Sequence, residues 1–196
     1  MAMDLMAELA EIGALKRGHF LLASGRHSDV YLEKFDLLRD PRATERICGR
    51  FADAFADLDV DVIAGPTTGG ILLAFETARQ MGLAAAYAER ASEGSDERVF
   101  KRGTTFEAGA RVAVVDDILT TGGSVRETLA ALAKQPVEVV AIGVLVDRSG
   151  GEVTFGDVPM HALAQQKVDS WDASACPLCR DGVPLVKPGS TAAKAG

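Results

Sequence analysis

One segment of the chain combines residue types that could bind a phosphorylated sugar. Val112–Val115 is a short apolar run typical of a buried strand, and it leads into the adjacent carboxylates Asp116 and Asp117. A turn of small residues follows, and then a helical pattern over 125–132. Such a turn presents backbone N–H groups and the positive end of the helix dipole to a phosphate, whereas carboxylates accept hydrogen bonds from sugar hydroxyls. We therefore expect ribose over the acids and a 5′-phosphate in the turn, which consists of Thr120, Thr121, Gly122, Gly123 and Ser124.

Two better-known phosphate motifs do not account for this segment. A P-loop requires Gly-Lys-Ser or Gly-Lys-Thr, and neither tripeptide occurs in the sequence. The dinucleotide pattern Gly-x-Gly-x-x-Gly follows none of the predicted strands. The alternative is a plain strand-to-helix turn in which Asp117 or Ser124 caps the helix. A cap needs only one such residue, so the full set of acids, hydroxyls and glycines favours a binding site.

A second glycine-rich turn, Gly65-Pro-Thr-Thr-Gly-Gly70, follows the apolar run Val60–Ala64. Its glycines allow the backbone to approach an anion closely, and it also leads into a helical pattern. By itself the turn could be an ordinary strand–turn–helix connection. The two turns end strands of one predicted sheet and lie one strand–helix unit apart, so together they favour a single anion site.

The elements that must position these turns alternate along the chain. Asp40-Pro41 predicts a helix start, with Asp40 as N-cap and Pro41 in the first turn. Alternating strands and helices predict a mainly parallel sheet with ligands at the carboxyl ends of its strands. The polar connection 89–109 is expected to be functional or mobile. The predicted helices are 3–15, 41–55, 69–81 and 125–132, and the predicted strands are 60–64, 83–88, 112–115, 137–146 and a strand–turn–strand over 20–34.

Composition limits the classes of protein to which the chain can belong. Its 196 residues suit one domain, with 47% hydrophobic and 25% charged residues. A net charge of −7 disfavours a nucleic-acid surface. We expect no membrane partner and a cytoplasmic location, because charges interrupt every apolar run and residues 1–20 do not form a signal peptide. Three cysteines suit a reducing compartment.

The segment Val112–Ser124 resembles the phosphoribosyl pyrophosphate motif of the type I phosphoribosyltransferases: an apolar strand, two acids, two variable residues, then Thr-Thr-Gly-Gly-Ser. The resemblance implies an α/β fold whose mainly parallel central sheet is flanked by helices, with a small hood from the N-terminal segment. It divides a single domain, 1–186, into a hood over 1–39, a core over 40–150 and a C-terminal segment over 151–186. Residues 187–196 are expected to be a disordered tail.

Roles for individual residues also follow from the resemblance. It implies Mg²⁺ as cofactor, a homodimer, and a non-proline cis peptide at Thr67-Thr68. The catalytic pair would be Asp116 and Asp117, and the ligands of phosphoribosyl pyrophosphate would be these acids with Thr67, Thr68, Gly69, Arg90, Lys101, Thr120, Thr121, Gly122, Gly123 and Ser124.

Three further segments resemble the orotate branch of that family, which makes orotidine 5′-monophosphate in pyrimidine biosynthesis. They are the hood sequence from Phe20 to Ser28 with Tyr31, the run Val144–Ser149, and the ending Ala175–Leu185. A planar cation such as Arg148 suits an anionic pyrimidine, although a salt bridge of Arg148 with Asp147 or another neighbour is the alternative. The implied orotate contacts are Ser24, Tyr31, Thr120 and Arg148.

The sequence departs from the orotate pattern in its cations. Ala23 and Gly69 stand where many orotate enzymes carry Lys, and the connection 89–109 lacks their dense Lys and His cluster. Arg90 and Lys101, with Arg98 and Arg102, are the cations that could substitute. The alternatives are a type I transferase for a purine base and a non-catalytic regulator that binds phosphoribosyl pyrophosphate; the latter is weakened by the lack of a preceding helix-turn-helix pattern.

The Cys-x-x-Cys pair Cys176 and Cys179 is a separate feature. Zinc takes four ligands, and the third cysteine, Cys48, falls in a predicted helix far upstream. The three histidines, His19, His27 and His161, are scattered without metal-ligand spacing. We therefore favour a structural turn or a contact of the C-terminal tail at the pair. The alternative is a zinc site shared across a dimer or completed by a distant histidine.

Overall fold

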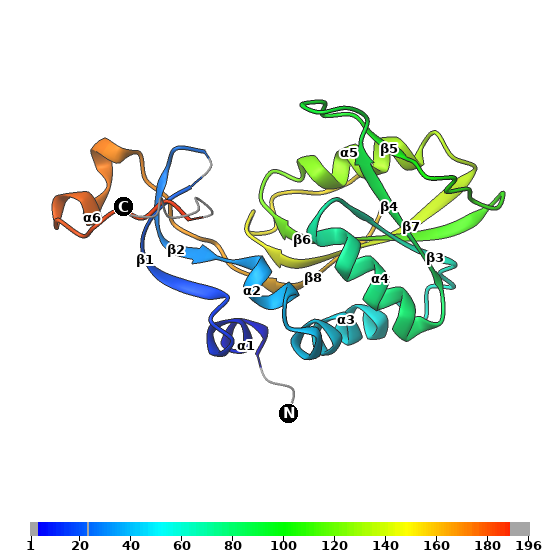
Figure 1. Ribbon diagram of the computed structural model, residues 1–196, viewed down its shortest axis with the longest axis horizontal. Helices are drawn as coiled ribbons and strands as arrows, with labels where there is room; N and C mark the ends of the chain where they lie inside the picture. The colour runs from blue at the N-terminus through cyan, green and yellow to red at the C-terminus, as the bar shows by residue number, and fades with distance from the viewer. Residues whose placement is uncertain (1–3, 23, 189–196) are drawn as a thin grey trace, which may run out of the picture. The chain divides into compact units, whose positions relative to one another are not determined.

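The computed structural model describes residues 4–22 and 24–188, and these residues form two compact units (Figure 1). One unit, the hairpin unit, combines the chain up to Asp36 with the chain from Val168 onward. The other, the sheet unit, is Leu37–Lys167. The interpretation of 1–186 as one domain stays a prediction. Ala23 and 189–196, most of the tail predicted to be disordered, lie outside the described residues.

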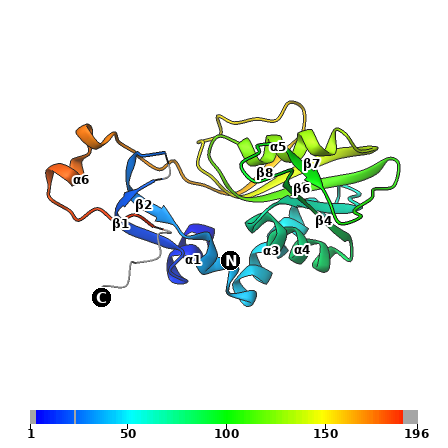
Figure 2. The same cartoon turned by 45° about the horizontal axis from the view of Figure 1, so that its top comes forward.

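The elements of the sheet unit are α3 (Pro41–Phe55), β3 (Val62–Pro66), α4 (Gly69–Met81), β4 (Ala84–Arg90), β5 (Arg98–Phe100), β6 (Ala110–Leu119), α5 (Gly123–Leu132), β7 (Val137–Asp147) and β8 (Met160–Gln165). The helix α2 (Lys34–Leu38) spans the boundary of the two units in the sequence. The six strands form one sheet with the order β5-β4-β3-β6-β7-β8. All neighbouring pairs are parallel except β4 and β5. Figure 2 shows α5 on one face of the sheet and α3 and α4 on the other. The predicted α/β class, with a mainly parallel sheet flanked by helices, is confirmed.

Local signals explain the helices that were predicted correctly. The Asp40 side chain caps α3 by accepting hydrogen bonds from the backbone N–H groups of Arg42 (2.9 Å) and Ala43 (3.3 Å). Helix α4 ends at Gly82, which adopts a left-handed conformation with φ 70°. Both helices have the predicted bounds, 41–55 and 69–81.

The central strand β6 is longer than predicted. The sequence placed Asp116 and Asp117 after a strand over 112–115, but β6 continues to Leu119. The strand continues because its backbone pairs with β7 as far as Leu119, which lies opposite Asp147. The two acids therefore lie within a strand, where successive side chains point to opposite faces of the sheet. Strands β5 and β8 were not predicted at all.

The hairpin unit contains β1 (Leu15–Leu21), which pairs antiparallel with β2 (His27–Leu32). The predicted strand–turn–strand is confirmed, although β1 begins earlier than expected. The helix predicted over 3–15 is shorter, α1 (Leu5–Glu11), because Gly13 adopts φ 74° and turns the chain into β1. The C-terminal segment of this unit carries a 3-10 turn, Ala173–Ala175, and the short helix α6 (Pro177–Arg180).

Backbone bonds attach this C-terminal segment to the hairpin. Trp171 and His27 exchange two hydrogen bonds, of 2.8 and 2.9 Å. Val186 accepts from Leu21 (2.9 Å) and donates to His19 (2.8 Å). The hairpin unit thus contains both early and late parts of the chain, whereas a hood over 1–39 and a separate C-terminal segment over 151–186 were predicted. None of the helices in the described part of the chain has the length and apolar character that a bilayer crossing requires.

Candidate active site

The two glycine-rich turns predicted from the sequence meet at one edge of the sheet. Strands β3 and β6 are parallel neighbours, with Ile63 opposite Ala113, so their carboxyl ends lie side by side. Gly69, after β3, lies against Asp117 near the end of β6. A Cβ atom on Gly69 would be 2.0 Å from Asp117 Oδ2, far closer than atoms can approach. Glycine at position 69 therefore lets the two turns come together.

Asp116 and Asp117 are both 5% exposed and serve different turns. Asp116 Oδ2 accepts a hydrogen bond from Ser124 Oγ (2.5 Å), at the start of α5. Asp117 reaches the start of α4 at Gly69. Because α4 and α5 cover opposite faces of the sheet (Figure 2), the acids diverge as the alternation along a strand requires. Each acid thus lies beside one of the two predicted anion turns.

The predicted phosphate turn has the geometry of a helix N-terminus. Gly122, the residue before α5, has φ 77°, and its carbonyl accepts from Arg126 N (2.9 Å). The side chains of Thr120 and Thr121 are exposed. The guanidinium of Arg126 donates to the Thr121 carbonyl and lies over the Phe155 ring, 5.3 Å from its centroid. Sequence reasoning missed this cation, although its position four residues after Gly122 could have placed it beside the turn.

The turn from Gly65 to Gly70 is tightly closed on itself. A Cβ atom on Gly65 would lie 2.2 Å from the Gly70 carbonyl oxygen, so these glycines allow close backbone approach. The peptide bond between Thr67 and Thr68 is cis, which confirms the expected non-proline cis peptide. Thr67 N donates to Ala88 O (3.1 Å), and Thr68 is exposed. The structure thus places Thr67, Thr68 and Gly69 together beside Asp117.

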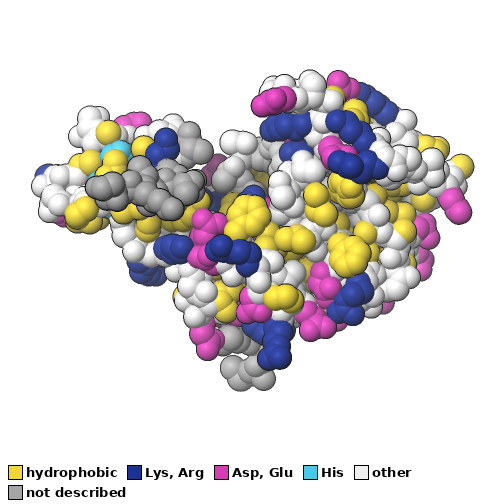
Figure 3. All heavy atoms as spheres, in the orientation of Figure 1, with side chains coloured by type: hydrophobic (Ala, Val, Ile, Leu, Met, Phe, Trp, Pro, Cys, Tyr) yellow, Lys and Arg dark blue, Asp and Glu magenta, His cyan; other side chains and the backbone are white. Residues whose placement is uncertain are grey.

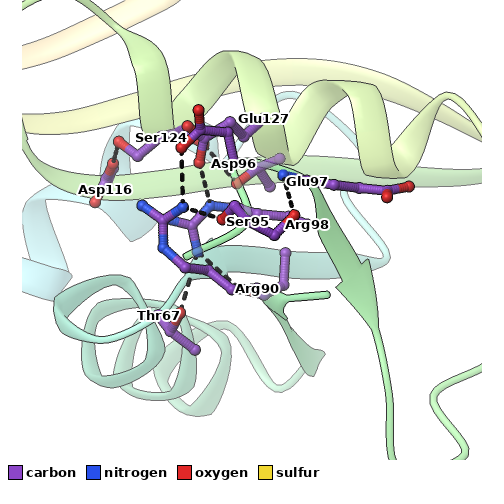
Figure 4. A network of polar contacts seen from close by, with 11 residues as sticks. Thr67, Arg90, Ser95, Asp96, Glu97, Arg98, Asp116, Ser124 and Glu127 are labelled. Carbon is purple, nitrogen blue, oxygen red and sulfur yellow. Dashed lines mark hydrogen bonds and ion pairs between the residues drawn. The ribbon is translucent and has the colours of Figure 1, made fainter. Parts of the chain in front are cut away.

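Arg98 connects this turn to α5. Its side chain, 5% exposed, donates from Nε to Glu127 Oε2 at 2.9 Å. Its Nη1 donates to Thr67 Oγ1 and to the Ala88 carbonyl, both at 3.1 Å. Figure 4 draws these bonds as dashed lines between β5, the turn and α5. Sequence reasoning considered Arg98 only as a substitute cation and missed Glu127, which the spacing Ser124-x-x-Glu127 at a helix start could have marked.

The other cations of the 89–109 connection contact that connection itself. Arg90 donates to the Ser95 carbonyl and lies 3.3 Å from Asp96 Oδ1. Lys101 Nζ donates to the carbonyls of Arg90 (2.7 Å) and Ala91 (3.1 Å). Arg102 pairs with Glu89 at 3.2 Å. The roles of Arg90 and Lys101 in binding pyrophosphate stay predictions.

Arg148 is a half-buried cation that the described residues leave unpaired. Burial lowers its pKa, and its buried Nε finds no hydrogen-bond partner in the described part of the chain. The alternative of a salt bridge with Asp147 is wrong. Asp147 instead accepts from Ser149 N (2.7 Å), Ser149 Oγ (2.6 Å) and Gly151 N (3.0 Å). An unpaired guanidinium of this kind can bind an anion with a planar arrangement of acceptors.

The predicted orotate contacts are divided between the two units. Thr120 and Arg148 belong to the sheet unit, whereas Ser24 and Tyr31 belong to the hairpin unit. Within the hairpin unit, Ser24 Oγ accepts from Arg26 N (3.4 Å). The Tyr31 ring packs against Phe20 with centroids 5.7 Å apart, and burial raises its pKa. The joint contact of these four residues with one base stays a prediction.

Comparison with known proteins gives consistent matches. A model of the phosphoribosyl transferase domain matches residues 37–170, close to the bounds of the sheet unit. The orotate phosphoribosyltransferase of Caldanaerobacter subterraneus is 41% identical over 182 residues, covering 92% of this chain and 93% of that protein. That of Methylobacterium is 43% identical and covers 98% of both. The crystal structure of orotate phosphoribosyltransferase from Aeropyrum pernix covers 83% of this chain and 94% of its own, with a TM-score of 0.69 and 29% identity.

Proposed function

The chain belongs to the orotate phosphoribosyltransferases, within the phosphoribosyl transferase domain family, and we propose that it transfers the 5-phosphoribosyl group of phosphoribosyl pyrophosphate to orotate. The products are orotidine 5′-monophosphate and pyrophosphate, a step in pyrimidine biosynthesis. The fold is that of the type I phosphoribosyltransferases. The observation that carries the proposal is the contact of Gly69 with Asp117, which brings two anion turns into one site.

The site suits a reaction that needs positioning more than proton transfer. Transfer at the ribose C1′ passes through a state with oxocarbenium character, so the enzyme must align the reactants and stabilise the leaving pyrophosphate. Asp116 and Asp117 would orient the ribose hydroxyls, and the turn 120–124 would hold the 5′-phosphate. Thr67, Thr68 and Gly69 would hold the pyrophosphate. The 89–109 connection would close over the site and exclude water, which otherwise hydrolyses the activated sugar.

Mg²⁺ fits the donor atoms of this site. It prefers oxygen ligands, and the carboxylates of Asp116 and Asp117 are 5% exposed beside both anion turns. These acids would hold the ion through its water shell or through the bound substrate. When bound, the ion would supply positive charge to the pyrophosphate oxygens.

Orotate is the acceptor that the unpaired Arg148 supports. Orotate is planar and carries a carboxylate, which a guanidinium can bind through two parallel hydrogen bonds. The half-buried position of Arg148 strengthens such a bond because little water competes for it. A purine base lacks the carboxylate and would leave this cation without a partner.

We further propose that the protein acts as a homodimer in the cytoplasm. Leu72 and Phe75 project from α4 and are 42% and 62% exposed. Figure 3 shows hydrophobic side chains gathered on the face of the sheet unit that carries α4. A second copy of the chain would cover this patch. Light scattering would measure the mass in solution, and we expect Phe75→Glu to convert a dimer to a monomer.

Turnover assays with phosphoribosyl pyrophosphate, Mg²⁺ and a single base test the activity. We expect turnover with orotate, and a loss of at least about a hundredfold in the Asp116→Asn/Asp117→Asn double variant with the fold retained. Asp61→Asn is the matched control, since Asp61 accepts from Arg111 N (2.8 Å) at the start of β6 rather than near its end. Turnover with adenine or xanthine and none with orotate would refute the acceptor, and an active double variant would refute the role of the acids.

A further inference from the structure

Four residues that are far apart in the sequence form a compact cluster in the hairpin unit. His19 lies on β1 and His27 on β2. Cys176 directly precedes α6, and Cys179 lies within it. One ligand atom from each residue lies within 4.8 Å of the other three. His19, His27 and Cys176 are only 2%, 5% and 3% exposed. The prediction that the histidines are scattered is therefore wrong for these two, because the fold brings them together.

The hairpin register explains why both histidines face the same region. His27 pairs with Leu21, two residues along β1 from His19. The register is irregular between Arg17 and Phe20, and in this arrangement His19 Nε2 lies 2.9 Å from His27 Nδ1 across the hairpin. The C-terminal segment crosses the same hairpin, held by the backbone bonds of Val186 to His19 and Leu21. This segment carries the two cysteines to the histidines.

The distances within the cluster are those of a metal site. The Cys176 Sγ–His19 Nε2 distance is 3.4 Å, and Cys179 Sγ lies 3.7 Å from His19 Nε2 and 3.3 Å from His27 Nδ1. Tetrahedral zinc, with Zn–S near 2.3 Å and Zn–N near 2.0–2.1 Å, separates its ligand atoms by about 3.3–3.8 Å. The two imidazole nitrogens are 2.9 Å apart, slightly closer than that. The separations of Cys176 Sγ from Cys179 Sγ and from His27 Nδ1 are within 4.8 Å, so closing the tetrahedron requires shifts of up to about 1 Å.

The second nitrogen of His19 supports metal binding by the first. His19 Nδ1 lies 2.8 Å from the Val183 carbonyl oxygen, which can only accept a hydrogen bond. Nδ1 must therefore carry the proton, and in the neutral ring the lone pair of Nε2 points into the cluster. Metal-binding histidines commonly have this arrangement, with one nitrogen bonded to a carbonyl and the other to the metal.

We propose that His19 Nε2, His27 Nδ1 and the thiolates of Cys176 and Cys179 bind one zinc ion. Two sulfur and two nitrogen ligands in tetrahedral geometry favour zinc over magnesium or calcium, which prefer oxygen. Four protein ligands leave no position for a substrate, so the ion is structural. Binding releases the two thiol protons. All four ligands come from one chain, so the site needs no partner subunit.

The zinc ion connects the early and late parts of the chain that form the hairpin unit. This unit has a small apolar core, and small units with limited cores commonly depend on a metal or a disulfide. The buried apolar residues of its first part are Leu5, Leu9, Ala14, Phe20, Val30 and Leu32. The ion would thus fix the segment from Cys176 to Val186 against β1 and β2.

Metal analysis of the full-length, reduced protein tests the proposal without any substitution. We expect about one zinc ion per chain. After exchange for Co²⁺, the protein should show the intense visible bands of tetrahedral cobalt and a sulfur-to-cobalt charge-transfer band. A reduced chain that binds neither added Zn²⁺ nor Co²⁺, or a cobalt spectrum without the charge-transfer band, would overturn the site.

Single substitutions then identify the ligands. Cys176→Ser and Cys179→Ser should weaken zinc binding more than tenfold, and a chelator should lower the Tm of the unsubstituted protein by more than that of these variants. Cys48→Ser and His161→Gln are matched controls, because they change the remaining cysteine and histidine, which lie in the sheet unit. Zinc bound by both ligand variants as tightly as by the unsubstituted protein, zinc binding weakened equally in the controls, or a Cys176–Cys179 disulfide in the isolated protein would each refute the proposal.

Discussion

Asp117 Oδ2 lies so close to Gly69 that the Cβ atom of any other residue at position 69 would be only 2.0 Å from this oxygen. Because of this overlap, the Asp117 carboxylate and a side chain at position 69 cannot both hold the observed positions. Glycine here is a requirement of packing between the two turns.

Gly69→Ala should therefore displace Asp117 and misplace the bound ribose. We expect kcat/KM for phosphoribosyl pyrophosphate to fall roughly tenfold to a hundredfold, with an unchanged circular dichroism spectrum. The control is Gly49→Ala in α3, where the nearest atom to the new methyl group is the flexible Gln80 Oε1 at 3.1 Å. Wild-type kcat/KM in Gly69→Ala would mean that Asp117 can move without any loss of activity, which would contradict this prediction.

Arg98→Met should affect both stability and substrate binding. It removes the ion pair with Glu127 and the bond to Thr67 Oγ1. We expect the free energy of unfolding to fall by about 2–3 kcal/mol, less than for a fully buried pair because the Glu127 side chain is 23% exposed. KM for phosphoribosyl pyrophosphate should rise because Thr67 loses its donor. Urea denaturation and steady-state kinetics measure the two effects.

An exposed ion pair that also involves the 89–109 connection provides the comparison for the buried Arg98 pair. Lys134 pairs with Glu97, and their side chains are 60% and 56% exposed. Lys134→Met should therefore lower the free energy of unfolding far less than Arg98→Met and leave the kinetics unchanged. Equal losses of unfolding free energy in Arg98→Met and Lys134→Met would show that the burial of Arg98 adds nothing to the stability of the protein.

Arg148→Lys separates recognition of the base from recognition of the sugar phosphate. Lysine keeps the charge but lacks the planar pair of donors, so KM for orotate should rise about tenfold or more while KM for phosphoribosyl pyrophosphate changes less than about twofold. Arg111→Lys, in an exposed pair with Glu138 (3.0 Å), is the control. A parallel rise of both KM values would contradict a role confined to orotate.

Alkaline pH should destabilise the sheet unit through Cys48. Burial raises the pKa of this thiol from 9.0 to about 12. Above pH 9 the unfolded chain loses the thiol proton while the folded protein keeps it, so stability falls as the pH rises, by at most about 1.4 kcal/mol per pH unit. Cys48→Ala lacks this dependence. The difference in unfolding free energy between the two proteins should shrink from pH 9 to 11, and parallel pH curves would refute the assignment.

Features set by neighbouring residues could be predicted from the sequence. Helices α3 and α4 have the predicted bounds because Asp40, Pro41 and Gly82 act within a few residues of the ends that they define. The cis peptide at Thr67-Thr68 followed from the family motif. The residues of the two anion turns could likewise be predicted, because glycines and hydroxyl residues next to a helix start form an anion site through groups that are close in the sequence.

Features that depend on pairing across the fold could not be predicted. Asp116 and Asp117 lie inside β6 because β7 pairs with that strand, which composition does not reveal. The bond of Arg98 to Glu127 joins residues 29 apart in the sequence, and the contact of Cys176 with His19 joins residues 157 apart. A search for metal ligands at fixed local spacing cannot find a cluster whose halves come from opposite parts of the chain.

The composition of the hairpin unit also determines the order in which the two units can fold during translation. His19 and His27 leave the ribosome early, whereas Cys176, Cys179 and Val186 follow only after the whole of Leu37–Lys167 has been synthesised. The sheet unit can form its own core during translation, because all six of its strands lie within that range. β1 and β2 must wait for their C-terminal partner, so the unit that is begun first is completed last.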